Sequence, residues 1–117
     1  MAVNIDEKFA AISAQWQPKR VARLNDYDVR LVKIEGEFVW HKHDDTDELF
    51  LVWKGAFRME YRDRAIELRA GDLHIVPRGA EHRPVAESEC WIMLVEPSDL
   101  VNTGDAGGPM TATVEEI

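Results

Sequence analysis

The chain has 117 residues, and its 14 basic against 22 acidic residues give a net charge of −8. An apolar fraction of 45% and a charged fraction of 31% are those of one ordinary globular domain. The basic residues are scattered and no apolar run approaches the roughly 20 residues of a membrane span, so we expect neither nucleic-acid nor membrane partners. The first residues lack a signal-peptide pattern and Cys90 is the only cysteine, which predicts a cytoplasmic protein without an intrachain disulfide.

The N-terminal stretch, residues 1–18, predicts a short helix followed by a break. Apolar residues recur at spacings of four, three and four, which places them on one face of a helix over residues 4–16. Asn4 and Glu7 have the spacing of a capping box at its start, and Pro18 ends the pattern. We expect the apolar face to pack on the domain or on a partner chain. It consists of Ile5, Phe9, Ile12 and Trp16.

Residues 19–97 predict strands throughout, with breaks every eight to twelve residues. This spacing favours a sandwich or barrel over alternating strands and helices, so the predicted fold class is all-β. The clearest alternation covers residues 57–62, which predicts a half-buried antiparallel strand followed by a hairpin turn at Asp63-Arg64. The expected strands span residues 19–24, 28–35, 38–43, 48–54, 56–62, 65–69, 73–76, 82–86 and 90–96.

Two of these strands, residues 48–54 and 90–96, are largely apolar on both sides. One side must line the interior, and the other must be covered by the helix, a second sheet or another subunit. This pattern predicts a homodimer. After the strands, residues 98–117 predict a Gly-rich C-terminal loop or tail, which either crosses the mouth of the barrel or stays mobile.

Four polar residues in two stretches form a candidate metal site. Residues two apart in a strand point to the same side, so His41 and His43, about 7 Å apart along the backbone, can converge on one ion. If the Asp-rich turn after them makes a hairpin, Glu48 folds back beside the two histidines. A carboxylate on an apolar inner face is costly unless it is paired or binds a metal. His82 follows a Pro-Arg-Gly turn and can complete the set.

Three imidazoles and one carboxylate suit a divalent transition metal, namely Fe, Mn, Ni, Cu or Zn, and disfavour Ca and Mg. Four protein ligands on an octahedral ion leave two positions open, as metal-assisted chemistry on a small molecule requires. The sequence selects neither the metal nor the substrate, and it identifies no catalytic acid or base.

The two stretches resemble the paired motifs of the cupin superfamily. The first family motif is Gly, five residues, His-x-His, three or four residues, Glu, six residues and Gly. This chain follows it from His41 through Glu48 to Gly55, with the leading Gly36 one residue too close. The second motif is Gly, five residues, Pro-x-Gly, two residues, His, three residues and Asn. This chain matches it from Gly71 to His82, with Ala86 in place of the usual Asn.

The resemblance covers roughly residues 20–96 and implies a double-stranded β-helix, the jelly-roll barrel of cupins. It also implies a metal inside the barrel, held by His41, His43, Glu48 and His82. Small cupins of this kind are often described as mannose-6-phosphate-isomerase-like, and the family includes dioxygenases, isomerases and metabolite-binding regulators. Because fold does not fix function, the reaction stays unassigned and the resemblance leaves open whether the protein is a metal-dependent enzyme.

Three hypotheses of function follow from the sequence and the resemblance. The first is a metal-binding cupin that acts on or binds a small organic molecule, with catalysis of the dioxygenase or isomerase type. The second is a non-catalytic module that binds a sugar or other metabolite. The third is a sugar-phosphate isomerase, which would need a basic pocket for phosphate. Only Lys42, Arg78 and Arg83 lie near the motifs, and Lys42 should point away from the interior.

The remaining candidates favour structural roles. We expect His74 to be a structural histidine or a neighbour of the metal ligands, and Cys90 to be a core residue. The acidic turn at residues 44–47 is expected to be solvated, and the four tryptophans are expected in the core or an interface.

Overall fold

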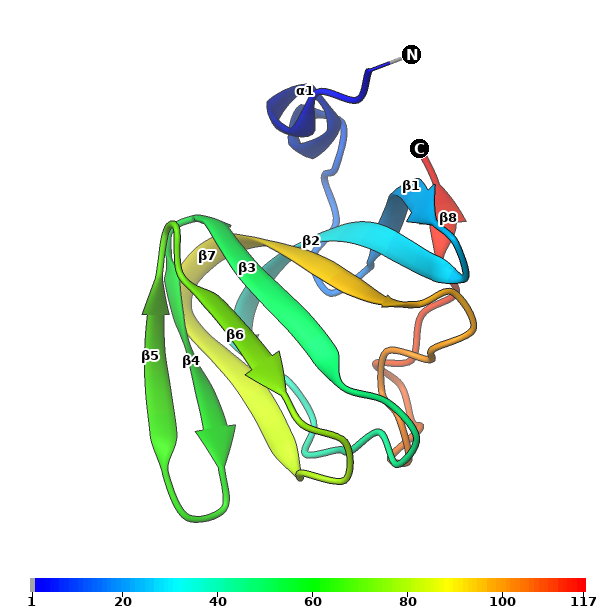
Figure 1. Cartoon of the computed structure of the whole chain (residues 1–117). Coiled ribbons are helices and arrows are strands. Elements are labelled where there is room, and N and C mark those ends of the chain that lie inside the picture. Colours follow the sequence, from blue (N-terminus) through cyan, green and yellow to red (C-terminus); the bar gives the residue numbers. More distant parts are fainter. Residues whose placement is uncertain (1) are drawn as a thin grey trace.

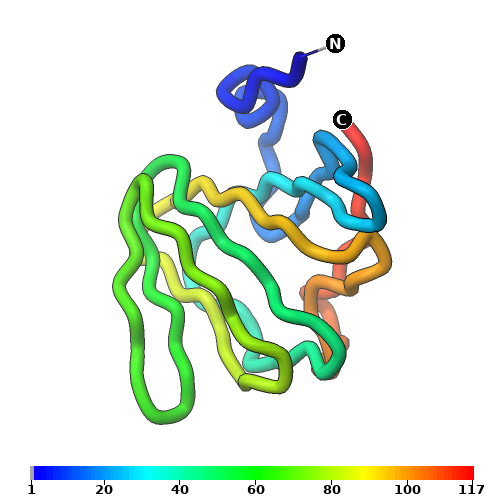
Figure 2. Tube along the Cα trace, in the orientation of Figure 1, coloured from blue at the N-terminus to red at the C-terminus, as the bar shows by residue number. Residues whose placement is uncertain are grey.

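The structure is a computed structural model that describes residues 2–117. Within that range no helix is long and apolar enough to cross a lipid bilayer. Over these residues the chain forms one short helix followed by eight strands, and α1 and β8 lie on the same side of the molecule (Figures 1 and 2). The elements are α1 (Ile5–Ala10), β1 (Lys19–Leu24), β2 (Tyr27–Glu37), β3 (Glu48–Lys54), β4 (Ala56–Tyr61), β5 (Ala65–Arg69), β6 (Leu73–Val76), β7 (His82–Pro97) and β8 (Glu115–Glu116).

Strand β7 is the centre of the sheet and connects its two layers. Its first part pairs with β4, its second part pairs with β3, and β2 follows it along most of its length. The neighbours on one side run in the order β7-β2-β1-β8, while β5 flanks β4 and β6 flanks β3. The strands thus wrap around an interior between the layers (Figure 1), which confirms the double-stranded β-helix.

Hydrogen bonds do not close the predicted barrel. Strand β5 pairs with β4, and β6 pairs with β3, but no ladder joins β5 to β6 in residues 2–117. Each of these edge strands is short, with five and four residues respectively, which limits the unpaired backbone that it presents to other chains. The fold is therefore a pair of facing layers with an open seam rather than a closed barrel.

Two of the predicted strands have different limits in the structure. Residues 82–86 and 90–96 form one continuous strand, because the polar segment between them contains neither Gly nor Pro and bends without leaving the ladder. Residues 38–43 do not form a strand, and their only β-bridge joins His41 to His82. Local apolar alternation predicted both incorrectly, since pairing depends on partners that are distant in the sequence.

The helix is also shorter than predicted. Asn4 caps it as expected, its side chain accepting a hydrogen bond from the backbone N–H of Glu7 at 2.9 Å. The helix ends at Ala10 instead of extending to Trp16, whose backbone has a φ of 61°. The N–H of Trp16 donates to the carbonyl of Lys33 at 2.8 Å. Tertiary contacts with β2 therefore override the helical periodicity of this segment.

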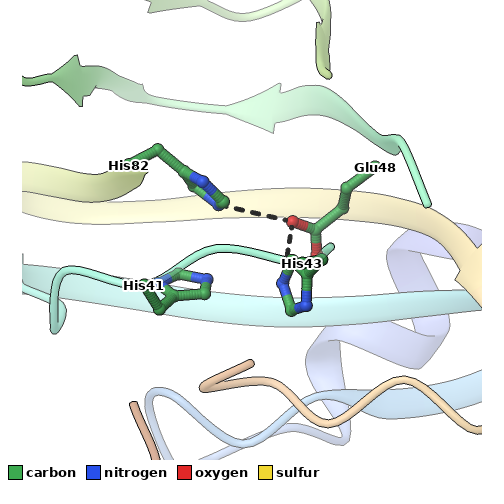
Figure 3. A group of neighbouring side chains, drawn as sticks. All are labelled: His41, His43, Glu48 and His82. Carbon is green, nitrogen blue, oxygen red and sulfur yellow. Dashed lines mark ion pairs between the residues drawn. The ribbon is translucent and has the colours of Figure 1, made fainter. Parts of the chain in front are cut away.

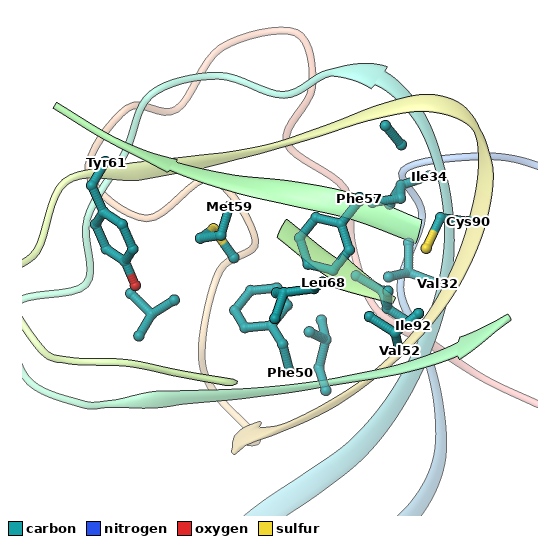
Figure 4. Close-up of a cluster of buried hydrophobic side chains, with 13 residues drawn as sticks. Val32, Ile34, Phe50, Val52, Phe57, Met59, Tyr61, Leu68, Cys90 and Ile92 are labelled. Carbon is teal, nitrogen blue, oxygen red and sulfur yellow. The ribbon is translucent and has the colours of Figure 1, made fainter. Parts of the chain in front are cut away.

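The main core lies between the two layers. Inward-facing residues of β2, β3, β4 and β7 fill it, and the alternation of residues 57–62 is confirmed by the burial pattern of β4 (Figure 4). The hairpin after β4 closes as predicted, with the N–H of Tyr61 donating to the carbonyl of Arg64 at 2.7 Å. A second cluster lies under α1, where Phe9 stacks on Trp91 with ring centroids 4.9 Å apart.

The outer face of the sheet carries two rows of apolar residues across four strands. Helix α1 covers one end, where Leu31 is fully buried, while Leu73 and Ile75 at the other end are 57% and 45% exposed. No element within residues 2–117 covers that exposed end. That a second copy of the chain covers it, as in the predicted homodimer, stays a prediction. The rows are Leu31, Met93, Leu51 and Leu73, and Val29, Val95, Leu49 and Ile75.

Candidate metal centre

The four predicted ligands come together inside the fold from three separate segments (Figure 3). His82 is the first residue of β7 and Glu48 is the first residue of β3, while His41 and His43 lie on the irregular segment before β3. Two backbone hydrogen bonds between His41 and His82, of 3.0 and 2.9 Å, hold that segment against β7. All four side chains are buried, and their ligand atoms lie within 4.8 Å of one another.

The carboxylate of Glu48 lies between two of the imidazoles. Its Oε1 atom is 3.5 Å from Nε2 of His43 and 3.6 Å from Nε2 of His82. The ring of His41 completes the group, with its centroid 4.3 Å from that of His82 and 5.1 Å from that of His43. The inward position of Glu48 beside Phe50 is the one that the sequence predicted.

Backbone carbonyls orient two of the histidines. Nδ1 of His41 is 2.9 Å from the carbonyl oxygen of Val39, and Nδ1 of His82 is 2.8 Å from that of Ala80. A proton on each Nδ1 donates to its carbonyl, which leaves the lone pair of Nε2 directed at the centre of the group. This arrangement is typical of metal-binding histidines, whose second nitrogen is fixed by a hydrogen bond.

Several buried atoms at this centre lack hydrogen-bond partners. They are Nε2 of His43, Nε2 of His82, Oε1 of Glu48 and Oε1 of the nearby Glu96. An unsatisfied buried polar atom costs about 1–3 kcal/mol, so several in one place need an explanation. A bound cation would satisfy the imidazole and Glu48 atoms together, and the cluster is compatible with a divalent transition metal.

Burial sets the protonation of the ligands. It lowers the pKa of His41 and of His43 to about 4, helped by the neighbouring imidazoles, and it also lowers the pKa of His82. All three rings are therefore neutral at pH 7 and can bind a metal. Burial raises the pKa of Glu48 to about 7, so the metal-free protein holds this carboxyl partly protonated at neutral pH.

We expect the affinity for a transition metal to fall about tenfold per pH unit between pH 7 and pH 5. Metal binding requires ionised Glu48, and below its folded-state pKa of about 7 one proton competes for that carboxylate. Above pH 8 the affinity should level off, and near pH 4 protonation of the imidazoles should make the fall steeper. Competition titrations against a chelator at each pH measure this slope, and an affinity unchanged from pH 8 to pH 5 would contradict it.

A buried charge network behind the site was missed by the sequence-based prediction. Glu96 lines the same cavity as Glu48, and burial together with the charge of Glu48 raises the pKa of Glu96 well above its usual value. Arg30 donates to Glu96 at 3.2 Å and to Asp28 at 3.0 Å, with less than 2% of each side chain exposed. Strand parity could have revealed these three residues. Asp28, Arg30 and Glu96 lie on the inward side of their strands, as the core residues of the same strands do.

The other candidate residues lie outside the site. His74 is 2.7 Å from the hydroxyl of Tyr61 and does not belong to the ligand group. Arg78 pairs with Asp47 at the surface, and Arg83 pairs with Glu60 at 2.8 Å. The remaining residues match their predicted roles: Cys90 is buried in the core, where burial raises its thiol pKa to about 12, and Lys42 points outward to Asp44.

The C-terminal loop packs against the site. Arg30 donates to the carbonyls of Ser98 and Leu100 at 2.8 and 2.9 Å, which fixes the start of the loop. Asp105 accepts a hydrogen bond from the N–H of Lys42 at 2.8 Å, between the two histidine ligands of that segment. A side chain at Gly104 would collide with the backbone of Lys42 and the ring of His43. Of the two arrangements that the sequence left open, the structure therefore shows the loop across the mouth.

A cavity opens beside the ligands and extends between the layers. Counted with its mouth, it has an empty volume of about 420 Å³. His41, Glu48 and Glu96 form its inner end, and Trp16 and Asn102 belong to its wall. A small molecule in this cavity would lie next to a metal held by the four ligands.

Fold, ligand group and cavity together define a protein of the cupin class. The model of the cupin domain family matches residues 29–96, and the chain belongs to this family.

Among individual proteins, the chain is similar to the uncharacterised protein YdbB of Bacillus subtilis, with 36% identity over 84 residues, or 71% of this chain and 68% of that protein. A cupin-2 domain containing protein from Shewanella frigidimarina has 47% identity and a TM-score of 0.81, covering 82% of this chain and 94% of that one. Protein NMB1881 from Neisseria meningitidis has 30% identity and a TM-score of 0.76, covering 84% and 100%.

Proposed function

We propose that this cupin binds a divalent transition metal through His41, His43, Glu48 and His82 and acts on a small organic molecule in the adjoining cavity. The observation that carries this proposal is the set of buried, unpartnered ligand atoms that converge on one point. When bound, the metal would supply Lewis-acid or redox chemistry. A cytoplasmic location, inferred from the sequence, belongs to the same proposal.

The residues of the chain define what surrounds the reacting molecule. Carbonyl-bound His41 and His82 keep fixed ring orientations, so the ligand set is preorganised before anything binds. The loop at residues 98–110 packs on His43, which is buried but also lines a second, open cavity between this loop and the acidic turn. Glu96 forms part of the cavity wall together with Glu48, and burial and the charge of Glu48 raise its pKa well above the usual value.

A sugar-phosphate isomerase is the weakest of the three hypotheses. No Lys or Arg belongs to the residues that line the cavity. The nearby Lys42, Arg78 and Arg83 each have a carboxylate partner on the outside of the domain. A phosphate group in the cavity would therefore lack the basic partners that its charge requires. A non-catalytic metabolite-binding module keeps the same site and differs only in the absence of turnover.

The test is elemental analysis of untagged protein purified without chelator, beside the double variant His41→Ala/His82→Ala. We expect near-stoichiometric Fe, Mn, Ni, Cu or Zn in the wild type and none in the double variant, because two of four ligands are gone. His74→Ala is the matched control, since His74 is a neighbouring histidine outside the ligand group. It should keep its metal. If wild-type protein contains no metal and takes up none on dialysis, the proposal is wrong.

A further inference from the structure

The wall of the cavity is mostly apolar. Nine of its thirteen lining residues are aromatic, aliphatic or proline, and none of the thirteen is Lys or Arg. Val32 and Ile92 belong to one side, where neighbouring strands β2 and β7 contribute their inward residues (Figure 4). Contact with this wall removes apolar surface of a ligand from water. Each Å² removed contributes about 25 cal/mol to the free energy of binding.

The aromatic part of the wall leads to one of the candidate metal ligands. Trp16 stacks on Phe38 with ring centroids 4.8 Å apart, and Phe38 meets the ring of His41 edge-on at 5.3 Å. The indole N–H of Trp16 donates to the carbonyl of Glu35, so its polar atom is used outside the cavity. Trp16 holds a φ of 61°, a left-handed conformation that costs a bulky residue about 1–2 kcal/mol. The fold tolerates this cost at a residue that forms the wall of the cavity.

Unpartnered polar atoms occur only at the inner end of the cavity, among the described residues. Of the residues that line the cavity, Glu48 and Glu96 carry these atoms. The amide of Asn102 also faces the cavity, but it donates to Met110 and accepts from Ala112 within its own loop, at 3.0 Å each. A polar group of a ligand therefore finds partners at the metal end, whereas a charge elsewhere along the wall would be desolvated without compensation.

The free space limits the size of the ligand. Counted with its mouth, the cavity has an empty volume of about 420 Å³. An apolar cavity of about 150 Å³ is enough to hold benzene. A single six-membered ring with one substituent therefore fits within this space.

We propose that the molecule bound at the metal is compact and uncharged, with an apolar body between the Trp16–Phe38 stack and the β2–β7 wall and one polar group directed at the metal. This inference rests on the function proposed above and narrows its substrate class. It assigns Trp16 the role of a binding residue, although it lies outside both metal-binding stretches.

The experiment measures binding of phenol, cyclohexanol and glucose 6-phosphate to metal-loaded wild-type protein by calorimetry and ligand-observed NMR. We expect phenol and cyclohexanol to bind at least tenfold more tightly than glucose 6-phosphate, and phenol binding to weaken at least tenfold in Trp16→Ala. Trp53→Ala is the control, because Trp53 lies on the outer face and does not line the cavity. It should bind phenol as the wild type does.

The outcomes separate this inference from the proposed function. If the protein holds stoichiometric metal but prefers glucose 6-phosphate, or if neither uncharged probe binds at about 10 mM, the substrate class is wrong and the metal site stands. If phenol binds with equal affinity to wild type and Trp16→Ala, the proposed position of the ligand beside Trp16 is wrong. If no metal is taken up, both proposals fail together. The comparison of probes on wild-type protein decides the matter even if Trp16→Ala does not fold.

Discussion

Replacing Arg30 with Met should lower the free energy of unfolding by about 3–5 kcal/mol, the usual effect of removing one partner from a buried ionic network. Arg30 is 1% exposed, and the change leaves Asp28 and Glu96 without its guanidinium and two loop carbonyls without their donor. A domain of this size is stable by only about 5–15 kcal/mol, so the variant should unfold at far lower urea concentration. Urea denaturation at pH 7 measures the difference.

The matched control is Arg62→Met. Arg62 also pairs with a carboxylate, Glu81, at 2.6 Å, but its side chain is 60% exposed. Surface ion pairs contribute little to stability, so this variant should unfold close to the wild type. Equal midpoints for the two variants would show that the buried network does not stabilise the domain.

Glu48→Gln should stabilise the metal-free protein at pH 8 while abolishing its response to metal. A carboxyl whose pKa is higher in the folded protein than in the unfolded chain costs stability once the pH exceeds the unfolded value. For a rise from 4.5 to about 7 the cost is about 3 kcal/mol at pH 8 and under about 1 kcal/mol at pH 5. Gln removes that cost, because its amide carries no charge at either pH. The stabilisation should therefore be large at pH 8 and small at pH 5.

Metal should stabilise the wild type and leave the stability of Glu48→Gln nearly unchanged. Free metal at a thousand times its Kd stabilises a binding protein by about 4 kcal/mol, and Glu48→Gln should lose nearly all of this. Glu67→Gln, an exposed carboxyl on β5, controls for the loss of a charge and should behave as the wild type. Urea titrations with and without metal at the two pH values separate the effects. A metal-free variant less stable than the wild type at pH 8 would contradict this prediction.

The sequence predicted the grouping of His41, His43, Glu48 and His82, whose candidate ligand atoms lie within 4.8 Å of one another, better than the elements that position them. Strand parity correctly placed Glu48 on an inner face, and the motif before His82 indicated the fourth residue. Residues 38–43 looked like a strand because their side chains alternate, and His41 and His43 are indeed both buried. The conformation of this segment is fixed by one bridge to His82 and by contacts with the C-terminal loop. Both partners are distant in the sequence, so no local pattern predicts them.

Residues with several possible roles were predicted less well. Trp16 fitted a helical stripe, yet its ring packs on Phe38 and its backbone leaves the helix, since the tertiary contact outweighs a weak local propensity. Glu96 ends an apolar strand, and its inward position was readable by parity only if the strand was taken as continuous. Arg30 shows the same difficulty, because a buried arginine is rare unless its partners, here Asp28 and Glu96, are known.

The loop at residues 98–110 packs against the candidate site but supplies none of its four ligands. Arg30 binds the carbonyls of Ser98 and Leu100, Asp105 accepts a hydrogen bond from the N–H of Lys42, and Gly104 packs on His43. All four candidate ligands precede this loop in the chain. What covers the candidate site is therefore separate from what forms it. A substitution in the loop can change the exposure of His43 and the partners of Arg30 without removing any of the four side chains.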